Sequence, residues 1–509
     1  MTFTLEELRR ATALLEAIVA ERGLLADLPE EDRRAFLVAA GRASRPDTYQ
    51  ERHLARAFRR KRRERLESAD REARAATGIR AGREAAVFAP PPRLCQGTEG
   101  PEHVLEKPKT CYVCKVEFRR LHHFYDALCP DCAAFNYEKR FQTADLTGRV
   151  ALVTGARVKI GFQTSLKILR AGGRVIATTR FPHDAARRYA MEVDFALWRD
   201  RLSVHGLDLR HAPSVELFAR YVEHSYDRLD ILVNNACQTV RRPPGFYEHL
   251  LPFEQVPFED IPADLRPLLV HQRDCIRALE APPALPEAAA PLDATGMATW
   301  QGGGSGIGLR ASARLSQVRY AYDDVARRPD LFPDGHTDVD LQQVDLRAQN
   351  SWRLKLAEVP TPEMIEVQLV NAVAPFILCS RLKALMLRAQ ERDKHIVNVS
   401  AMEGVFSRGT KTDRHPHTNM AKAALNMLTL TSARDYVAEG IHMNAVDTGW
   451  VTDEDPALHA TRKREELDFQ PPLDIVDGAA RICDPFFSGL RTGEHVWGQF
   501  LKDYKPSPW

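Results

Sequence analysis

The feature that most constrains the fold is an alternation of short apolar runs with helical stretches that begins at Arg149. The strand candidates are VALVTGA, RVIATTR, SVHGLDL and LDILVNNA, followed later by HIVNVSA (395–401) and IHMNAVDTG (441–449). Parallel strands need crossover helices and are apolar on both faces. The alternation therefore predicts an α/β fold with a doubly wound parallel sheet.

A second pattern is a cluster of cysteines, CYVC (111–114) and CPDC (129–132), separated by 14 residues. Two CxxC turns can each direct a pair of thiolates at one tetrahedral Zn²⁺, and a site of four protein sulfurs is closed and therefore structural. The expected metal ligands are Cys111, Cys114, Cys129 and Cys132. His122 and His123 lie between the knuckles as alternative ligands, and free buried thiols are the alternative to a metal site. The module resembles zinc-ribbon and treble-clef units.

The chain divides into four kinds of segment. Residues before the linker APPPRL alternate apolar and charged positions at helical spacing, whereas a proline- and alanine-rich stretch later interrupts the strand candidates. Loops of that length are typically functional or disordered, so this stretch is interpreted as an insertion. The expected segments are a helical N-terminal region (1–93), a zinc-binding module (105–143), a nucleotide-binding domain (147–240 and 360–509) and the insertion (241–359).

Composition limits the partners and the location. The 509 residues carry a formal net charge of +2, so no overall field favours nucleic acid or an anionic membrane surface. The basic run at 59–65 precedes acidic residues and is interpreted as a solvated helix face, with a nucleic-acid contact as the less favoured alternative. No signal peptide is evident, and no run approaches the roughly 20 apolar residues of a membrane span. We expect a cytoplasmic protein that forms a homo-oligomer.

The first strand candidate ends in TGARVKIG (154–161), which is typical of a phosphate-binding turn. A strand that ends in a glycine turn and opens a helix places backbone N–H groups and the positive end of the helix dipole against a pyrophosphate. Gly155 and Gly161 allow close backbone approach, whereas Lys159 stands where a middle glycine is usual. The glycine-rich WQGGGSGIGLR (300–310) has no strand before it and is interpreted as a flexible loop.

Together, five stretches resemble the short-chain dehydrogenase/reductase superfamily over about residues 147–240 and 360–460. They are TGARVKIG, LDLR with Asp208, NNAC (234–237), LVNAVAPF with Asn371, and NVSA followed by Lys422 and NAVDTGWV. The resemblance implies a Rossmann-type sheet that binds a dinucleotide at its carboxyl edge. It places Asp208 and Leu209 by the adenine, Asn235 and Ala236 along the cofactor, and Val451 near the carboxamide. Thr448 replaces the usual proline before Gly449.

The charge near the second strand indicates which dinucleotide is bound. An acidic residue at that strand end accepts bonds from the ribose of NAD, whereas the 2′-phosphate of NADP needs cations. RVIATTR has Thr179 in the acidic position and Arg180 after it, and Arg157 and Lys159 add positive charge. NADP is therefore expected, with NAD as the alternative. The full set of expected cofactor-binding residues is Gly155, Arg157, Lys159, Ile160, Gly161, Arg180, Asp208, Leu209, Asn235, Ala236, Lys422 and Val451.

The expected reaction centre departs from the family pattern. In the family, a tyrosine four residues before a lysine passes a proton to or from the substrate, the lysine holds the nicotinamide ribose, and a serine on the preceding strand holds the substrate oxygen. Four residues before Lys422, in the position of the family tyrosine, stands Thr418, whose hydroxyl is a poor proton shuttle. When the chain is aligned on Asn398, Ala401 stands in the position of the family serine. The candidate catalytic residues are therefore Asn371, Thr418 and Lys422.

Two functions remain open from the sequence. The first is atypical oxidoreduction of an unknown small molecule, for instance hydride delivery to an activated double bond or an iminium, which needs no phenol. His415 and His417 are candidate proton carriers near neutral pH, although such residues more often cap or pack. The second is a catalytically inactive nucleotide-binding sensor or scaffold, whose zinc module and helical arm bind a protein partner.

Overall fold

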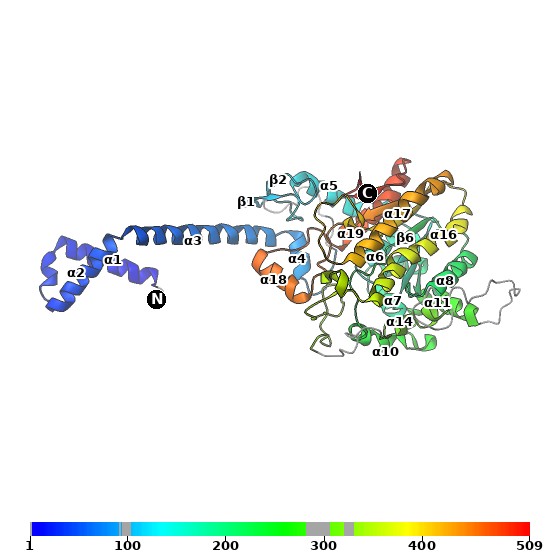
Figure 1. Cartoon of the computed structure of the whole chain (residues 1–509), viewed down its shortest axis with the longest axis horizontal. Coiled ribbons are helices and arrows are strands. Elements are labelled where there is room, and N and C mark those ends of the chain that lie inside the picture. Colours follow the sequence, from blue (N-terminus) through cyan, green and yellow to red (C-terminus); the bar gives the residue numbers. More distant parts are fainter. Residues whose placement is uncertain (1–2, 91–92, 94–102, 281–305, 320–329) are drawn as a thin grey trace. The chain divides into compact units, whose positions relative to one another are not determined.

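The computed structural model describes residues 3–90, 93, 103–280, 306–319 and 330–509 (Figure 1). The contacts divide the chain into two compact units, Met1–Asp70 and Arg71–Trp509. This boundary falls inside a helix, α3 (Thr48–Ala75), whereas the helical region was expected to end at residue 93.

The first unit is helical and has almost no core. It contains α1 (Leu5–Ala20), the 3₁₀ turn η1 (Arg22–Leu25), α2 (Glu30–Ser44) and most of α3. Thr4 starts α1 with a capping box, in which its side chain and that of Glu7 bond each other's backbone N–H. The basic run of α3 is exposed, and Arg60 and Arg63 form ion pairs with Glu64 and Glu67 one turn later.

The second unit is built on an eight-stranded sheet with the order β10-β9-β8-β7-β6-β3-β4-β5. All neighbouring strands are parallel except β9 and β10. The order reverses between β3 and β6, which creates the crevice where sheets of this type bind ligands. The strands are β3 (Val150–Thr154), β4 (Arg174–Thr179), β5 (Leu202–Gly206), β6 (Ile231–Asn234), β7 (Lys394–Ser400), β8 (Ile441–Asp447), β9 (Phe500–Lys502) and β10 (Lys505–Ser507).

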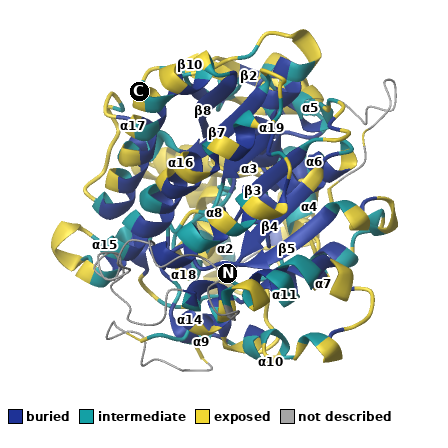
Figure 2. Cartoon of the chain, turned by 90° about the vertical axis from the view of Figure 1, so that its right-hand side faces the viewer, coloured by how far each residue is buried: buried dark blue, intermediate teal, exposed yellow. Residues whose placement is uncertain are grey.

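Helices cover both faces of the sheet, which is the buried centre of the molecule in Figure 2. Alternate residues of a strand point to opposite faces, so Ala151 and Val153 of β3 belong to one core and Val150 and Leu152 to the other. The first core contains α6 (Lys159–Arg170), α7 (Pro182–Ala190) and α19 (Ile475–Thr492). The second contains α8 (Ala212–Ser225), α16 (Ala374–Leu387) and α17 (Pro416–Ala438). The predicted doubly wound α/β fold is confirmed.

The described part of the expected insertion packs against the sheet edge. Gln272 of α11 (Arg266–Glu280) accepts a bond from the Gly206 backbone N–H of β5 at 3.1 Å, which satisfies a donor on the edge strand. The other α-helices among its described residues are α9 (Pro244–Tyr247), α10 (Leu251–Glu254), α13 (Ile307–Arg310) and α14 (Ser312–Leu315).

The glycine-rich stretch at 300–310 is described only from Gly306 onward, and residues 300–305 lie outside the described residues. Its described end is a buried helical turn, α13, not the flexible loop that we expected. The Gly308 carbonyl accepts from the Asp208 N–H at 2.9 Å, and its own N–H donates to the Ser214 hydroxyl at 2.9 Å. These two bonds hold the turn against the end of β5.

One helical stretch, Thr361–Leu387, is long and apolar enough to cross a membrane, although no run of the sequence was expected to be. It joins α15 (Thr361–Gln368), a π-helical turn (Leu369–Val373) and α16. Its most apolar window has a mean hydropathy of 1.5 and is 61% buried, because α16 packs in the second core. A buried core helix passes the same test, so this is weak evidence for a membrane span.

The cysteine-containing module is a small unit beside α19 (Figure 1). It contains an antiparallel hairpin of β1 (Val104–Thr110) and β2 (Glu117–Arg120), followed by α5 (Pro130–Phe141). The short α4 (Gly78–Glu84) packs into the same core through Ile79. α18 (Ala457–Leu467) lies in the segment between β8 and α19.

Candidate functional site

A cleft of about 1290 Å³ opens at the carboxyl ends of β3 to β8. This position is where open parallel sheets bind ligands, at the reversal of strand order. All twelve residues expected to bind the cofactor line it. Of the expected catalytic residues, Lys422 lines the cleft, whereas Asn371 and Thr418 are buried beside it.

The turn after β3 is a cradle that only glycine can form at two positions. Gly155 has a φ of +66°, in the region that favours glycine. A Cβ on Gly161 would lie 2.3 Å from the Gly155 carbonyl oxygen and 2.4 Å from the Asn235 amide nitrogen. Lys159 at the start of α6 has a φ of +55°, so it adopts the backbone conformation for which a middle glycine is usual. A pyrophosphate therefore fits against the backbone of this turn.

The end of the cleft expected to hold adenine carries a buried ion-pair network. The Asp208 carboxylate is bonded by the Arg210 guanidinium at 2.6 Å, and Arg210 also bonds Glu366 at 2.6 Å. Burial raises the pKa of Asp208, but the charge and hydrogen bonds of Arg210 and the charge of Arg180 together outweigh burial, so the net pKa lies below its usual value. Asp208 and Leu209 are therefore fixed in place by the protein before any ligand binds.

The cations expected to favour NADP are not equivalent. Arg157 is buried and bonds Asp184 at 2.7 Å, so its guanidinium is engaged within the fold, although Arg187 and Arg188 bond the same carboxylate. Arg180 instead donates to the Tyr247 hydroxyl at 2.6 Å and lies over the Tyr247 ring at 4.6 Å. It forms no direct ion pair among the described residues, although its charge helps to lower the pKa of Asp208. The charge argument for a 2′-phosphate therefore depends on Arg180 together with Lys159, which also lines the cleft.

One face of α17 borders the reaction end of the cleft. Asn419 and Lys422 are three residues apart on α17, which places them on the same face, and both line the cleft together with His415, the residue directly before the helix. The Lys422 ammonium donates to the Val399 carbonyl of β7 at 2.7 Å. Thr418 is 1% exposed, and its hydroxyl has no hydrogen-bond partner within the described ranges.

The serine region of β7 agrees in part with the expected geometry. Ser400 lines the cleft, but its hydroxyl donates to the Asn426 amide oxygen of α17 at 2.5 Å. Ala401, the residue aligned with the family serine, also lines the cleft and has no polar side-chain atom to offer. Thus neither position presents a free hydroxyl to a ligand.

Asn371 lies in the π-helical turn between α15 and α16. Its side chain accepts from the Gln238 N–H at 2.8 Å and donates to the Gln238 carbonyl at 3.2 Å. This paired grip fixes the backbone directly after NNAC, where Asn235 and Ala236 line the cleft. Asn371 therefore affects the cleft indirectly, because it fixes the position of the Gln238 backbone.

The two candidate histidines differ in access to the cleft. The His415 ring stacks on Trp352 with centroids 3.9 Å apart, and it lines the cleft. His417 is 1% exposed and lies outside the cleft lining. Burial lowers the pKa of His415 and lowers that of His417 to about 4, so both rings are mainly neutral at pH 7. Proton donation at neutral pH is disfavoured for both.

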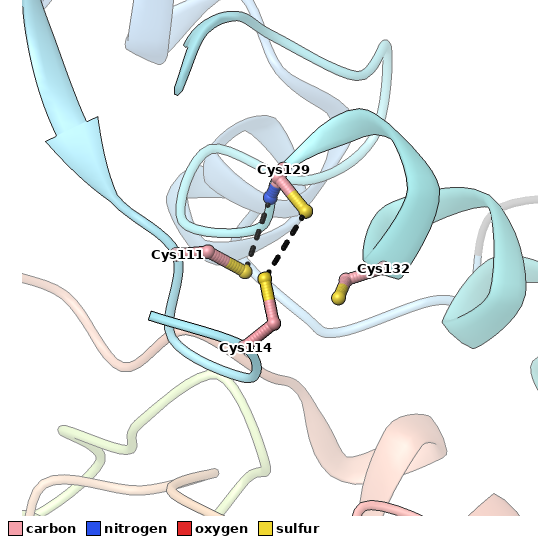
Figure 3. Close-up of side chains that lie close together, drawn as sticks. All are labelled: Cys111, Cys114, Cys129 and Cys132. Carbon is pink, nitrogen blue, oxygen red and sulfur yellow. Dashed lines mark hydrogen bonds between the residues drawn. The ribbon is translucent and has the colours of Figure 1, made fainter. Parts of the chain in front are cut away.

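The four cysteines expected to bind metal come together (Figure 3). Their sulfur atoms all lie within 4.8 Å of one another, with Cys114 Sγ and Cys129 Sγ 3.6 Å apart. Zn–S bonds of about 2.3 Å in tetrahedral geometry need sulfur separations of this size. The Cys129 N–H donates to Cys111 Sγ at 3.3 Å, a contact that favours a thiolate. The donor set and its geometry fit a closed Zn²⁺ site.

Sequence reasoning missed the contribution of the cysteine module to the cleft. Tyr112 and Lys115 of the first knuckle line it, together with Asp447 at the end of β8 and Lys502 of β9. Burial, with a smaller effect of Asp447, raises the pKa of the Tyr112 phenol. Tyr112 therefore keeps its proton and can donate a hydrogen bond, but it is a poor proton shuttle. No spacing rule relates a zinc knuckle to a strand end so far along the chain.

Together, the sheet, the glycine cradle and the cleft define a protein with a Rossmann-type fold. The family model described as short chain dehydrogenase matches residues 149–256, and the one described as enoyl-(acyl carrier protein) reductase matches residues 348–470. Each model covers less than half of this chain, and the two matched segments are similar to the short-chain dehydrogenase/reductase superfamily.

Curated relatives match this chain over very different lengths. The chain is 29% identical over 405 residues to the uncharacterized protein R665 of Acanthamoeba polyphaga mimivirus, a match that covers 77% of this chain and 74% of that protein. Retinol dehydrogenase 13 of Mus musculus is 37% identical over 93 residues, which is 18% of this chain and 28% of its own. The further relatives likewise match over only 24–34% of their length.

Solved structures show a weaker overall similarity. The NADPH-bound carbonyl reductase from chicken fatty liver aligns over 72% of this chain and 100% of its own, with 16% identity and a TM-score of 0.41. The Pseudomonas aeruginosa RhlG/NADP complex aligns over 70% of this chain and 94% of its own, with 17% identity and a TM-score of 0.40. These values are too low for any transfer of activity.

Proposed function

We propose that this protein is an NADP-dependent oxidoreductase with an atypical active site that lacks the tyrosine and serine of its family. The observation that carries the proposal is that Lys422 and the Gly155 and Gly161 cradle line one cleft. When bound, NADPH supplies a hydride to the substrate. The structural Zn²⁺ at the four cysteines has no part in that transfer.

The residues of the cleft suggest how the chain itself acts. Arg180 would hold the 2′-phosphate, the cradle the pyrophosphate, and Lys422 the nicotinamide ribose after leaving the Val399 carbonyl. With Thr418 buried and Ala401 apolar, no aligned group delivers a proton, which costs roughly 10²- to 10⁴-fold in a carbonyl reduction. This favours substrates that need mainly hydride, such as activated double bonds, the class named by the family model at 348–470.

Cofactor choice is tested by calorimetry with NADPH and NADH. Arg180→Asp should weaken NADPH binding by about tenfold or more, the size expected for a charge-assisted hydrogen bond, and should leave NADH binding unchanged or improved. Arg199→Asp is the matched control, because Arg199 is 58% exposed and outside the cleft lining. Equal NADPH affinity in both variants would contradict the NADP preference, and a protein that binds neither dinucleotide would contradict the whole proposal.

A second candidate function is a nucleotide-binding sensor or scaffold without turnover, whose zinc module or N-terminal helices bind a protein partner. The engagement of Ser400 by Asn426 and the burial of Thr418 favour it. NADPH consumption across a panel of activated double bonds, aldehydes and iminium compounds separates the two functions. Turnover that is abolished by Lys422→Ala supports the oxidoreductase, and binding without turnover supports the sensor.

A further inference from the structure

The zinc knuckles lie in contact with a segment that forms one wall of the cleft. Residues 448–474 connect β8 to α19, and the part from 449 to 474 is the wall segment. Six consecutive residues of the wall segment, 450–455, line the cleft together with Gly449. Val451 is among the residues expected near the cofactor carboxamide. The cysteine module contacts both ends of this wall segment.

Tyr112 holds the beginning of the wall segment. It lies between the ligands Cys111 and Cys114, and its hydroxyl accepts the Trp450 backbone N–H at 3.0 Å. The Tyr112 N–H donates to the Ala127 carbonyl at 2.9 Å, which ties the first knuckle to the stretch that leads into the second. The position of the Tyr112 hydroxyl thus follows from the geometry of the knuckle.

Arg140 holds the end of the wall segment. It lies in α5, which starts directly after Cys129, and it bonds Asp474 at 2.6 Å and Asp477 at 2.9 Å. All three side chains are buried, so loss of one partner would leave an uncompensated charge in the interior. Tyr125, between the knuckles, donates to Asp477 at 2.5 Å. The start of α19 is therefore fixed by the module.

The apolar core of the module contains the wall segment as well. Cys111, Cys129 and Leu128 share one buried cluster with Val451 and Leu473, and Ile160 of the cofactor cradle packs against it. Val451 and Ile160 are both cleft residues. A change in the knuckles is therefore transmitted by direct contact to two positions that border the dinucleotide.

From these contacts we propose that Zn²⁺ bound by Cys111, Cys114, Cys129 and Cys132 orders residues 449–474, with Tyr112 as a positioning residue, and thereby sets the affinity of the cleft for its dinucleotide. The ordering step stands on the contacts alone, whereas the effect on affinity rests on the proposed function. The zinc module then makes the order of this wall of the cleft depend on the bound metal.

Hydrogen exchange measured by mass spectrometry tests the ordering step without cofactor. The full-length protein is compared with zinc and after chelation, and the zinc-loaded Tyr112→Phe variant is compared with the zinc-loaded parent. We expect faster exchange in peptides from 449–474 after chelation. In Tyr112→Phe we expect about fivefold faster exchange at the Trp450 amide, the factor for one lost neutral hydrogen bond, with zinc content unchanged.

Tyr436→Phe is the matched control, because it removes a hydroxyl that donates to the Cys379 carbonyl at 3.1 Å between α17 and α16, outside the cleft lining. It should leave exchange in 449–474 unchanged. Unchanged exchange in this segment after chelation or in Tyr112→Phe overturns the proposal, as does purified protein that binds no zinc. Where NADPH binds, Tyr112→Phe should also weaken it, while Tyr436→Phe should not. Failure of NADPH binding alone contradicts the proposed function and leaves the exchange result valid.

Discussion

Gly161 occupies the most crowded position of the phosphate cradle. A methyl group there would lie 2.3 Å from a backbone carbonyl oxygen, and backbone cannot move aside as a flexible side chain can. We expect Gly161→Ala to abolish NADPH binding and to destabilise the fold by about 1–3 kcal/mol through overpacking. Calorimetry and urea unfolding measure the two effects.

Gly41 supplies the control for that substitution. It lies in α2, and no atom of the described residues comes within 4 Å of the place that a Cβ would take. Gly41→Ala should therefore be neutral or stabilising by up to about 1 kcal/mol. If Gly161→Ala binds NADPH as the parent does, the turn after β3 is not the pyrophosphate site.

At the scale of single residues, the sequence predicted where the site residues lie better than it predicted which partners their charged side chains bind. The glycine spacing of TGARVKIG located the cradle, because steric exclusion depends on backbone geometry alone. The ion pair of Arg157 was not predictable, since its partner Asp184 lies 27 residues later on α7 and no spacing rule connects them. The left-handed conformation of Lys159 was also not predictable, since the sequence does not show that a residue with a side chain adopts it at this position.

At the scale of elements, the π-helical turn before α16 makes a prediction about Asn371. Its side chain makes two bonds to the Gln238 backbone, and removal would leave the N–H and carbonyl of this half-buried residue without these partners. We expect Asn371→Ala to lower the free energy of unfolding by about 2 kcal/mol and to weaken NADPH binding, because the backbone after NNAC loses its support. Chemical denaturation and calorimetry provide the measurements.

Asn444 of β8 allows a matched comparison. Its side chain also makes two hydrogen bonds to backbone, but away from the cleft. It donates to the Val496 carbonyl at 2.7 Å and accepts from the Gln499 N–H at 3.2 Å. Asn444→Ala should cost similar stability without a change in NADPH affinity. A parallel loss of affinity in both variants would show that Asn371 has no specific effect on the cleft.

The elements of the sheet were predictable, whereas the walls of the cleft were not. The apolar runs from Val150 to Val446 indicated six parallel strands because burial on both faces leaves a strong pattern. No comparable sequence pattern indicated that the expected insertion and the cysteine module would line the cleft. Trp352 against His415, and Tyr112 against Trp450, are contacts between elements far apart in sequence, and they follow only from the tertiary packing.

At the scale of the whole molecule, buried histidines make stability depend on pH. Burial lowers the pKa of His205 from 6.5 to about 3, that of His122 to about 4, and that of His417 to about 4. Since the unfolded chain then binds protons first, stability is full above about pH 6.5 and falls as the pH decreases. Glu254 opposes this in part, because burial raises its pKa to about 7 and its protonation on acidification favours the folded state.

His205 isolates one contribution to this dependence. Its ring is 0% exposed and lies 5.3 Å from Phe218, so His205→Phe keeps the packing and removes the titration. We expect the variant to lose about 2 kcal/mol less stability than the parent between pH 7 and pH 5. Urea unfolding at both pH values gives the difference. Parallel losses in parent and variant would contradict the assignment of His205 as a buried neutral group.

The buried ion pair of Arg140 with Asp474 has a consequence for synthesis of the chain. The two residues are 334 positions apart, so the ribosome makes the knuckles long before the segment that completes their core. At roughly 5–20 residues per second, the nascent module waits roughly 20 to 70 seconds for this partner. During that interval a bound metal can hold the knuckles together, so we expect the zinc supply at the ribosome to govern the yield of folded protein.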